Sequence, residues 1–242
     1  MPDAFFISDL HLDDERPRIT DLFLRFLRSE AREAAALYIL GDLFESWIGD
    51  DDDSPLARTV QEALAALTRS GVATHFMAGN RDFLVGDAFA ARTGVALLSD
   101  PTRRDVGGVR TLLMHGDTLC TDDVAYQKFR RQVRDPAWQQ AFLAQPLAQR
   151  RAFAAQAREQ SRQHTGSALA QIMDVTDEAV RDALQTHDAT RLIHGHTHRP
   201  GRHTIALGDR SAERVVLGDW YEQGSVLRAD GGEVVLETRT LA

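Results

Sequence analysis

The chain has 242 residues, of which 43% are hydrophobic and 26% are charged, the ordinary balance of a globular protein. Its formal net charge of −8 argues against nonspecific binding to nucleic acid, because such binding needs a basic surface. No apolar run approaches the roughly 20 residues that cross a bilayer, and the N-terminus lacks the basic start of a secretory signal. The single cysteine, Cys120, excludes an intrachain disulfide and is expected to be a small buried hydrophobe. The expected location is the cytoplasm, with attachment to a membrane surface left open.

Strand and helix patterns alternate along the chain and predict an α/β fold. Short apolar runs predict buried strands at 5–7, 37–40, 75–78, 110–114 and 191–193. Apolar residues at helical spacing predict amphipathic helices over 19–36 and 59–69. After Ile205, alternating stretches predict short strands joined by tight turns, such as the one at 230–232.

Polar side chains follow each of the five predicted buried strands. They are Asp9, His11, Asp42, Asn80, His115, His196 and His198. Since ligands bind outside the carboxyl ends of strands in α/β sheets, we expect these side chains to converge. Carboxylate, imidazole and amide groups suit Mn, Fe, Zn or Mg, although imidazole disfavours Mg. Such a set is too large for one tetrahedral ion and fits two, the arrangement used for phosphoryl chemistry. The glycines before Asp42, Asn80 and His196 are expected to permit a tight backbone there.

The segment 122–186 differs from the rest because it is predicted to be almost purely helical. Its basic residues are Lys128, Arg130, Arg131, Arg134, Arg150, Arg151, Arg158 and Arg162, interleaved with the apolar residues Phe129, Trp138, Phe142, Leu143, Leu147 and Phe153. One interpretation is a helical hairpin with a solvated charged face. The other is a lid that binds an anionic, partly apolar ligand or lies on an acidic membrane surface. The acidic run 50–53 is predicted to be a solvated loop.

Five motifs occur in a fixed order, each after an apolar strand: Asp-x-His, Gly-Asp, Gly-Asn-Arg-Asp, His-Gly-Asp and Gly-His-Thr-His. Together they resemble the calcineurin-like metallophosphoesterase superfamily. The resemblance implies a β-sandwich flanked by helices. It also implies that Asp9, His11, Asp42 and His198 hold one metal ion. Asp42 would bridge to a second ion, completed by Asn80, His115 and His196.

Longer runs, at 6–12, 79–83, 115–123, 172–175, 192–200 and 215–220, resemble the UDP-2,3-diacylglucosamine diphosphatase family of lipid A biosynthesis. That resemblance implies hydrolysis of the pyrophosphate of UDP-2,3-diacylglucosamine to 2,3-diacylglucosamine 1-phosphate (lipid X) and UMP. It implies two divalent ions, with Mn²⁺ preferred, and work on the cytoplasmic face of the inner membrane. We expect a monomer, built from a core at 1–121 and 187–242 and a helical lid inserted at 122–186.

Roles for individual residues follow from the same resemblance. Catalysis is assigned to Asp42, Asn80, Arg81, His115 and His196, with the Arg81 guanidinium on a substrate phosphate. Substrate binding is assigned to Asn80, Arg81, Asp123, Ser161, Thr165, Ala168 and His196. The family usually has polar or basic contacts where Thr165 and Ala168 stand, so His164 or Arg162 is an alternative there.

Alternatives remain at several positions and for the function. His194 is expected to be buried or to support a ligand rather than to bind metal, and Asp117 either orients His115 or is a plain turn residue. Trp220 and Tyr221 are expected in the core. A phosphodiesterase or phosphoprotein phosphatase with the same metal core is the alternative enzyme. A binding module on an inactive scaffold is disfavoured, because every expected ligand position is filled.

Overall fold

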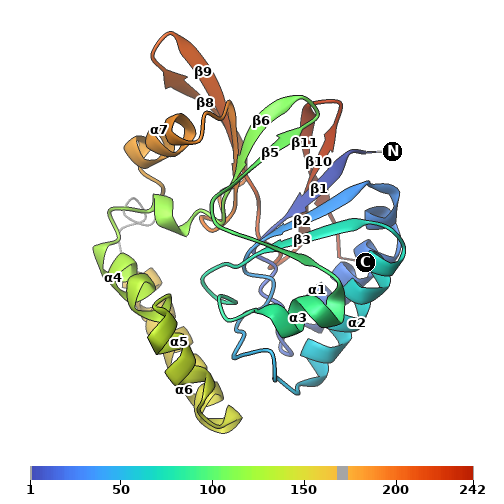
Figure 1. Cartoon of the computed structure of the whole chain (residues 1–242), viewed down its shortest axis with the longest axis vertical. Helices are drawn as coiled ribbons and strands as arrows, with labels where there is room; N and C mark the ends of the chain where they lie inside the picture. Colours follow the sequence, from blue (N-terminus) through green and yellow to red (C-terminus); the bar gives the residue numbers. More distant parts are fainter. Residues whose placement is uncertain (1, 168–173, 242) are drawn as a thin grey trace.

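Two β-sheets pack face to face, with helices on their outer faces, in the computed structural model (Figure 1). The model describes residues 2–167 and 174–241, with side chains outside the description from 161 to 167. The first sheet has the order β11 (Glu233–Arg239), β10 (Gly224–Asp230), β1 (Ala4–Ile7), β2 (Ala36–Leu40), β3 (Ala73–Met77) and β4 (Ala96–Leu98). The second has the order β5 (Thr102–Val106), β6 (Val109–Leu113), β7 (Arg191–His194), β9 (Arg210–Val216) and β8 (Gly201–Leu207). The predicted α/β class and sandwich are confirmed.

The alternation of side chains along β1 shows how the layers are held together. Ala4 and Phe6 lie in a buried cluster between the sheets, together with Ile193 of the second sheet. Phe5 and Ile7 point the other way, into a cluster with the helices α1 (Pro17–Arg28), α2 (Pro55–Arg69) and α3 (Asp87–Thr93). Because successive side chains of a strand face opposite sides, a strand covered on both faces is apolar throughout. The buried strand predicted at 5–7 is therefore confirmed.

Strand direction brings the loops of the predicted site to the ends of neighbouring strands. The pairs β1–β2 and β2–β3 are parallel in the first sheet, and β6–β7 is parallel in the second. Parallel neighbours end at the same edge of a sheet. The loops after β1, β2 and β3 are therefore adjacent, as are those after β6 and β7.

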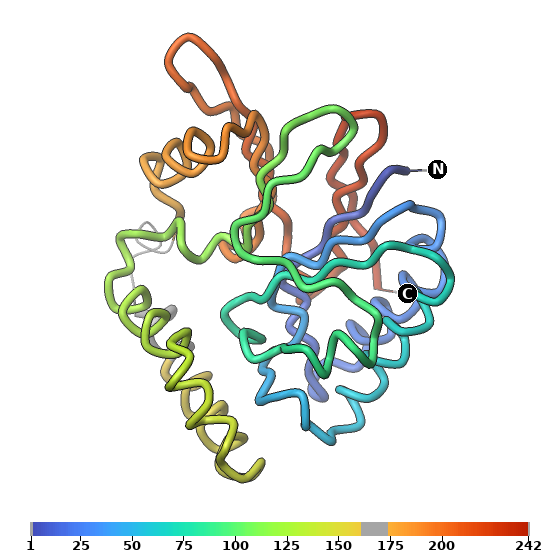
Figure 2. Tube along the Cα trace, viewed as in Figure 1, coloured from blue at the N-terminus to red at the C-terminus, as the bar shows by residue number. Residues whose placement is uncertain are grey.

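The chain leaves the sandwich after β6 and runs out along three helices before it returns (Figure 2). These helices are α4 (Val124–Val133), α5 (Pro136–Leu143) and α6 (Leu147–Ser167), and they form the elongated arm in Figure 1. The next helix, α7 (Asp177–Thr186), packs on the second sheet, because Val180 and Leu184 share a buried cluster with Leu112 and Leu192. Within the described residues, none of the helices combines the length and apolar character needed to cross a bilayer.

One predicted helix is too long. The helix expected over 19–36 ends at Arg28, a short 3-10 helix follows at Glu30–Glu33, and Ala36 already belongs to β2. The hydroxyl of Ser29 donates to the carbonyl of Arg25 at 2.8 Å and the Ser29 backbone leaves the helical region. The pairing of Ala36 with Ala4 then favours a strand over the helical preference of the alanine run.

Candidate metal centre

The seven predicted ligands all lie in loops that follow strands. Asp9 and His11 follow β1, Asp42 follows β2, Asn80 follows β3, His115 follows β6, and His196 and His198 follow β7. The loops of both sheets meet, since Asp9 after β1 contacts the backbone amide of His196 and the ring of His198 after β7. The convergence predicted from the strand ends is confirmed in this respect.

The first group of facing side chains is Asp9, His11 and His198. The Nε2 atoms of His11 and His198 lie 3.2 Å apart, and His198 Nε2 lies 3.5 Å from Asp9 Oδ1. One ligand atom from each of the three residues falls within 4.8 Å of the others. Two imidazoles and a carboxylate at this spacing can hold a divalent ion of the Mn, Fe or Zn type.

The second group surrounds Asn80 and shares Asp42 with the first. Asn80 Oδ1 lies 2.9 Å from His115 Nε2 and 2.9 Å from His196 Nδ1. Asp42 Oδ1 lies 3.8 Å from His115 Nε2, whereas Asp42 Oδ2 lies 3.8 Å from His11 Nε2. The two oxygens of Asp42 thus face different groups of ligands, an arrangement in which one carboxylate can contact two ions.

An unpaired oxygen atom tests whether a cation fits. Asp9 Oδ2 accepts from the Ser8 hydroxyl and from the backbone amide of His196, but Asp9 Oδ1 makes no hydrogen bond with any residue described. Asp9 is completely buried. A buried ionised oxygen without a hydrogen bond is costly, so a metal ion between Oδ1 and His198 would remove an unfavourable term.

Backbone strain is concentrated in the same residues. The φ angles of Asp9, His11, Asp42, His196 and His198 are 56°, 48°, 54°, 67° and 54°. In the described part of the chain, the sole other non-glycine residue with positive φ is Asp188. Non-glycine residues avoid this left-handed region, and such strain gathers at functional sites. The backbone is therefore shaped to direct these side chains inward.

Close backbone approach explains the glycines that precede the ligands. A Cβ atom on Gly79 would lie 2.2 Å from Asp42 Oδ1, and one on Gly195 would lie 2.2 Å from Asp9 Oδ2. Gly41 has a φ of 89°, and a Cβ atom there would lie 2.5 Å from His115 Nδ1. The prediction that these three glycines permit tight geometry is confirmed.

Negative charge dominates the centre. Burial favours the neutral form of His115, but the nearby carboxylates of Asp42, Asp117 and Asp9 raise its pKa to about 9. Burial and the charge of His115 lower the pKa of His196 to about 4. A field that stabilises a cationic imidazole also attracts a metal cation.

Asp82 supports the centre and was given no role by the sequence patterns. Its Oδ1 accepts from the amides of Gly79 and Asp42 at 2.8 and 3.2 Å, and its Oδ2 accepts from Leu43 at 2.7 Å. One buried carboxylate therefore ties the loop after β2 to the loop after β3. The only available signal was its place in the Gly-Asn-Arg-Asp motif.

Asp117 neither orients the His115 ring nor acts as a plain turn residue. His115 Nδ1 lies 2.9 Å from the carbonyl of Leu40, which leaves Nε2 to face Asn80. Asp117 Oδ2 instead accepts from the hydroxyl of Tyr126 at 2.5 Å and from Arg130 Nε at 2.7 Å. Both earlier alternatives for Asp117 were wrong, because its carboxylate anchors the first lid helix.

Three further predictions concern aromatic residues and His194 beside the ligands. Trp220 is fully buried, as expected, but Tyr221 is 43% exposed and its ring stacks on His11 with centroids 5.3 Å apart. The prediction that Tyr221 belongs to the core was therefore wrong. His194 is buried and its Nδ1 lies 2.8 Å from the Gly195 carbonyl, in agreement with the buried interpretation.

The residues predicted to bind substrate are placed only in part. Asn80 and Arg81 line a cavity beside the metal centre, and Asp123 caps α4 by accepting from the Tyr126 amide at 2.9 Å. Ser161 and Thr165 belong to α6, but their side chains lie outside the described part of the structure. Ala168 lies outside the described residues altogether.

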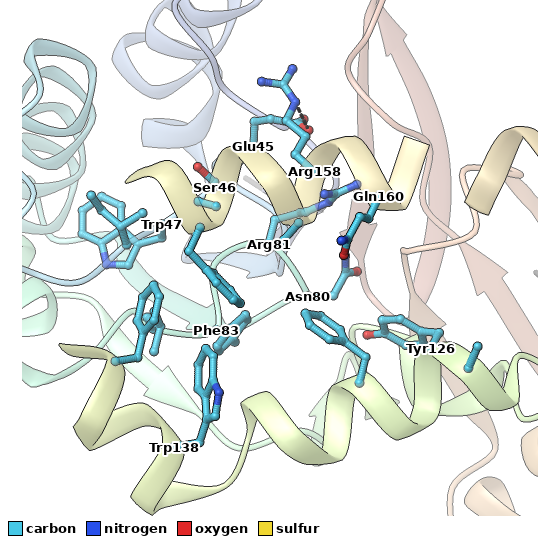
Figure 3. A pocket seen from close by; sticks show the side chains of 18 residues that line it. Glu45, Ser46, Trp47, Asn80, Arg81, Phe83, Tyr126, Trp138, Arg158 and Gln160 are labelled. Carbon is cyan, nitrogen blue, oxygen red and sulfur yellow. Dashed lines mark ion pairs between the residues drawn. The ribbon is translucent and has the colours of Figure 1, made fainter. Parts of the chain in front are cut away.

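The cavity has a volume of about 280 Å³ and lies between the lid helices and the core loops (Figure 3). Its polar lining residues are Glu45, Ser46, Asn80, Arg81, Tyr126, Arg158 and Gln160. The rest of its wall is largely apolar, from the core residues Trp47, Ile48, Phe83 and Leu84 and the lid residues Phe129, Trp138, Phe142 and Phe153. The cavity thus leads from a predicted metal ligand to an aromatic wall.

Four lid arginines pair with carboxylates of the core. At distances from 2.5 to 3.2 Å, Arg130 pairs with Asp117, Arg150 with Asp51, Arg151 with Asp52 and Asp53, and Arg158 with Asp13 and Glu45. The interpretation of a solvated charged face did not include these pairs, and the interpretation of a ligand-binding lid stays a prediction, since Arg158 also lines the cavity. In the acidic run at 50–53, Asp51 and Asp53 are exposed, as predicted for a solvated loop, but they also pair with Arg150 and Arg151 of α6.

Comparison with known proteins identifies the family. The model of the calcineurin-like phosphoesterase family matches residues 4–200. The chain is 55% identical to a UDP-2,3-diacylglucosamine hydrolase of Stenotrophomonas maltophilia, covering 97% of this chain and 98% of the relative. Proteins of the same name from Xanthomonas oryzae pv. oryzae (56%, covering 97% and 98%) and Xanthomonas campestris pv. campestris (57%, covering 98% and 99%) are similar over the same extent. The chain therefore belongs to the calcineurin-like phosphoesterase family and, within it, to the group of the UDP-2,3-diacylglucosamine hydrolases.

Proposed function

We propose that this protein hydrolyses the pyrophosphate bond of UDP-2,3-diacylglucosamine to 2,3-diacylglucosamine 1-phosphate and UMP. The observation that carries the proposal is the continuity between the candidate metal centre and an apolar cavity of about 280 Å³. A pyrophosphate needs cations at one end of the site, and acyl chains need apolar surface at the other. The names of the relatives, which are more than half identical over nearly the whole chain, point to the same substrate.

Two divalent ions fit the ligands present. Asp9, His11, Asp42 and His198 would hold one, and Asp42, Asn80, His115 and His196 would hold the other, with Mn²⁺ as the proposed metal. When bound, such a pair supplies an activated water and neutralises charge on the phosphate oxygens. The chain's own residues orient the substrate: His115 and His196 face the Asn80 side of the site, and Arg81 offers a bidentate guanidinium to a phosphate.

The proposed core and lid carry different parts of the site. The core at 1–121 and 187–242 carries every proposed metal ligand, and the lid at 122–186 carries most of the aromatic cavity wall. Each methylene buried there contributes about 0.8 kcal/mol, so a few methylenes decide between an acylated and a plain pyrophosphate. Asp123 at the start of α4, with Ser161, Thr165 and Ala168 further along the lid, is proposed to contact the glucosamine side of the substrate.

The site of action is proposed to be the cytoplasmic face of the inner membrane, where the protein works as a peripheral monomer. The lid helix α4 supports this, because Val124 is 71% exposed and the charged residues Lys128 and Arg131 on the same helix are exposed as well. An apolar side chain beside cations favours an acidic lipid surface. Sedimentation with phosphatidylglycerol vesicles should deplete the wild type more than Val124→Asp, and equal depletion would contradict this surface.

A mass-spectrometric assay tests the reaction. The purified protein is incubated with UDP-2,3-diacylglucosamine, with and without Mn²⁺, and UDP-glucose serves as a pyrophosphate without acyl chains. We expect UMP and 2,3-diacylglucosamine 1-phosphate only when the metal is present, and little turnover of UDP-glucose. Absence of turnover with Mn²⁺, or equal turnover of both substrates, would contradict the proposal.

A further inference from the structure

We propose that Glu45 is a positioning residue that couples the lid to the metal centre. Its carboxylate lies between His11, a proposed metal ligand, and Arg158 of the lid helix α6. The inference rests on the proposed function, because it concerns the same metal centre. It adds that the position of the lid, and hence the filling of the cavity, changes how tightly the metal is held.

The contact with His11 is on the ring nitrogen that faces away from the ligands. Nε2 of His11 faces His198 at 3.2 Å and Asp42 at 3.8 Å, whereas Nδ1 lies 3.3 Å from Glu45 Oε2. A carboxylate on the second nitrogen of a ligating histidine fixes the tautomer and makes the ring a stronger ligand. Glu45 is in that position and is only 7% exposed, so solvent screens the contact little.

The contact with the lid uses the other oxygen of the same carboxylate. Arg158 Nε lies 3.0 Å from Glu45 Oε1, and Arg158 Nη1 donates to Asp13 Oδ2 at 3.0 Å. The ion pair between Glu45 and Arg158 is drawn in Figure 3. Since Asp13 is two residues after His11, the lid arginine holds both the loop that carries His11 and the carboxylate behind its ring.

A core arginine completes the arrangement. Arg16 Nη2 donates to Glu45 Oε2 at 3.1 Å and also to the backbone carbonyl of His11. Glu45 therefore keeps one cationic partner when the lid moves away, but it loses the partner that holds Oε1. Its carboxylate is then held at Oε2 alone instead of at both oxygens. A carboxylate held at one oxygen fixes the His11 ring less firmly, which weakens the ligand without unfolding the core.

The cavity is next to the contacts that join the lid to His11. Glu45 and Arg158 both line the 280 Å³ cavity, so an acyl chain that fills it holds α6 in place beside Glu45. By thermodynamic linkage, a lid position that strengthens metal binding must itself be favoured by metal binding. Binding of a correctly acylated substrate in the cavity would therefore strengthen the binding of metal by the protein.

The lid–core ion pairs of Arg151 lack this link. Arg151 of the same helix pairs with Asp52 and Asp53 at 3.2 and 2.5 Å, and neither carboxylate contacts a proposed metal ligand in the described structure. Arg151 therefore offers a matched control: the same residue type on the same helix, paired with core carboxylates, but without access to His11.

The test measures Mn²⁺ binding to the full chain by electron paramagnetic resonance titration, without substrate. We expect Glu45→Gln to weaken one of two Mn²⁺ sites by about 10- to 100-fold, the range typical for partners of metal-ligating histidines. Arg158→Gln should weaken the same site by a smaller factor, and Arg151→Gln should leave both sites unchanged. In hydrogen exchange, Mn²⁺ should slow exchange in α6 of the wild type, and this protection should be lost in Glu45→Gln.

Each outcome bears on the inference. Wild-type Mn²⁺ affinity in Glu45→Gln overturns it and leaves the proposed function standing, because the metal centre is then intact without Glu45. Equal weakening in Arg151→Gln and Arg158→Gln also overturns it, since general docking of the lid would then be responsible. A wild type that binds no Mn²⁺ overturns both the inference and the proposed function. Arg158 is on the lid surface, so Arg158→Gln remains informative if Glu45→Gln fails to fold.

Discussion

The aromatic wall of the lid should control substrate choice, and Phe153→Asp tests this directly. Phe153 lines the cavity and contacts Trp138 and Phe142, with ring centroids 5.7 and 5.2 Å apart. Its ring is 38% exposed, so the substitution introduces charge into the cavity without burying it in the core. Phe142 is less suitable, because it is 5% exposed and belongs to the main buried cluster.

The expected effect follows from burial. If the aspartate keeps about three methylene groups of an acyl chain out of the cavity, the loss is about 2.4 kcal/mol at 0.8 kcal/mol each, or roughly 50-fold in kcat/KM. The assay compares kcat/KM for UDP-2,3-diacylglucosamine with that for bis-p-nitrophenyl phosphate, a small phosphodiester without acyl chains. We expect the loss on the first substrate and almost none on the second.

The control is Leu143→Asp, which is 41% exposed on α5 and does not line the cavity. It introduces the same charge at a similar exposure and should change neither rate. An equal loss on both substrates in Phe153→Asp, with metal content retained, would show that the lid takes part in the chemistry. Unchanged kcat/KM on the diacyl substrate would show that the cavity does not hold the acyl chains.

Three further predictions concern the metal centre and the docking of the lid. Asp42→Ala should abolish hydrolysis and lower the Mn²⁺ content found by elemental analysis, because Asp42 faces both groups of ligands; full activity in the metal-stripped variant would contradict this. Asp82→Asn should lower the free energy of unfolding by about 1–3 kcal/mol in urea denaturation. Three backbone N–H groups donate to the two carboxylate oxygens of Asp82, and an asparagine has only one acceptor oxygen in place of the two. Unchanged stability would show that these hydrogen bonds are not needed to keep the two loops in place. Hydrogen bonds from Arg150 and Arg151 lower the pKa values of Asp51 and Asp53. The stability that these pairs contribute is therefore fully present above the ordinary carboxyl pKa, and it is lost as the pH falls through the lowered pKa values. Hydrogen exchange in α6 should therefore quicken in acid before exchange in β1 does, and simultaneous loss of protection would refute selective release of the lid.

The convergence of the proposed metal ligands could be predicted because its signal is local. Each follows an apolar strand, and parallel strands bring their carboxyl ends together whatever the rest of the chain does. The same rule explains why Asp42 lies between His11 and His115, since β2 lies beside β1. Family membership, expected from the ordered motifs, is confirmed.

The supporting contacts were not predictable because they join distant residues. Arg150 and Asp51 are 99 positions apart, and nothing in either local sequence distinguishes a paired charge from a solvated one. Tyr221 has no pattern that separates a ring in the core from a ring stacked on His11. Asp82 was visible in a motif, but its role depends on three backbone amides from two loops.

The most direct test of the proposed reaction is hydrolysis of UDP-2,3-diacylglucosamine in ¹⁸O-water with Mn²⁺, followed by mass spectrometry of both products. The proposal places water attack on the phosphorus attached to uridine, so one ¹⁸O atom should appear in UMP and none in 2,3-diacylglucosamine 1-phosphate. Label in the lipid phosphate would contradict the assigned site of attack, and a lack of products would contradict the proposed function itself.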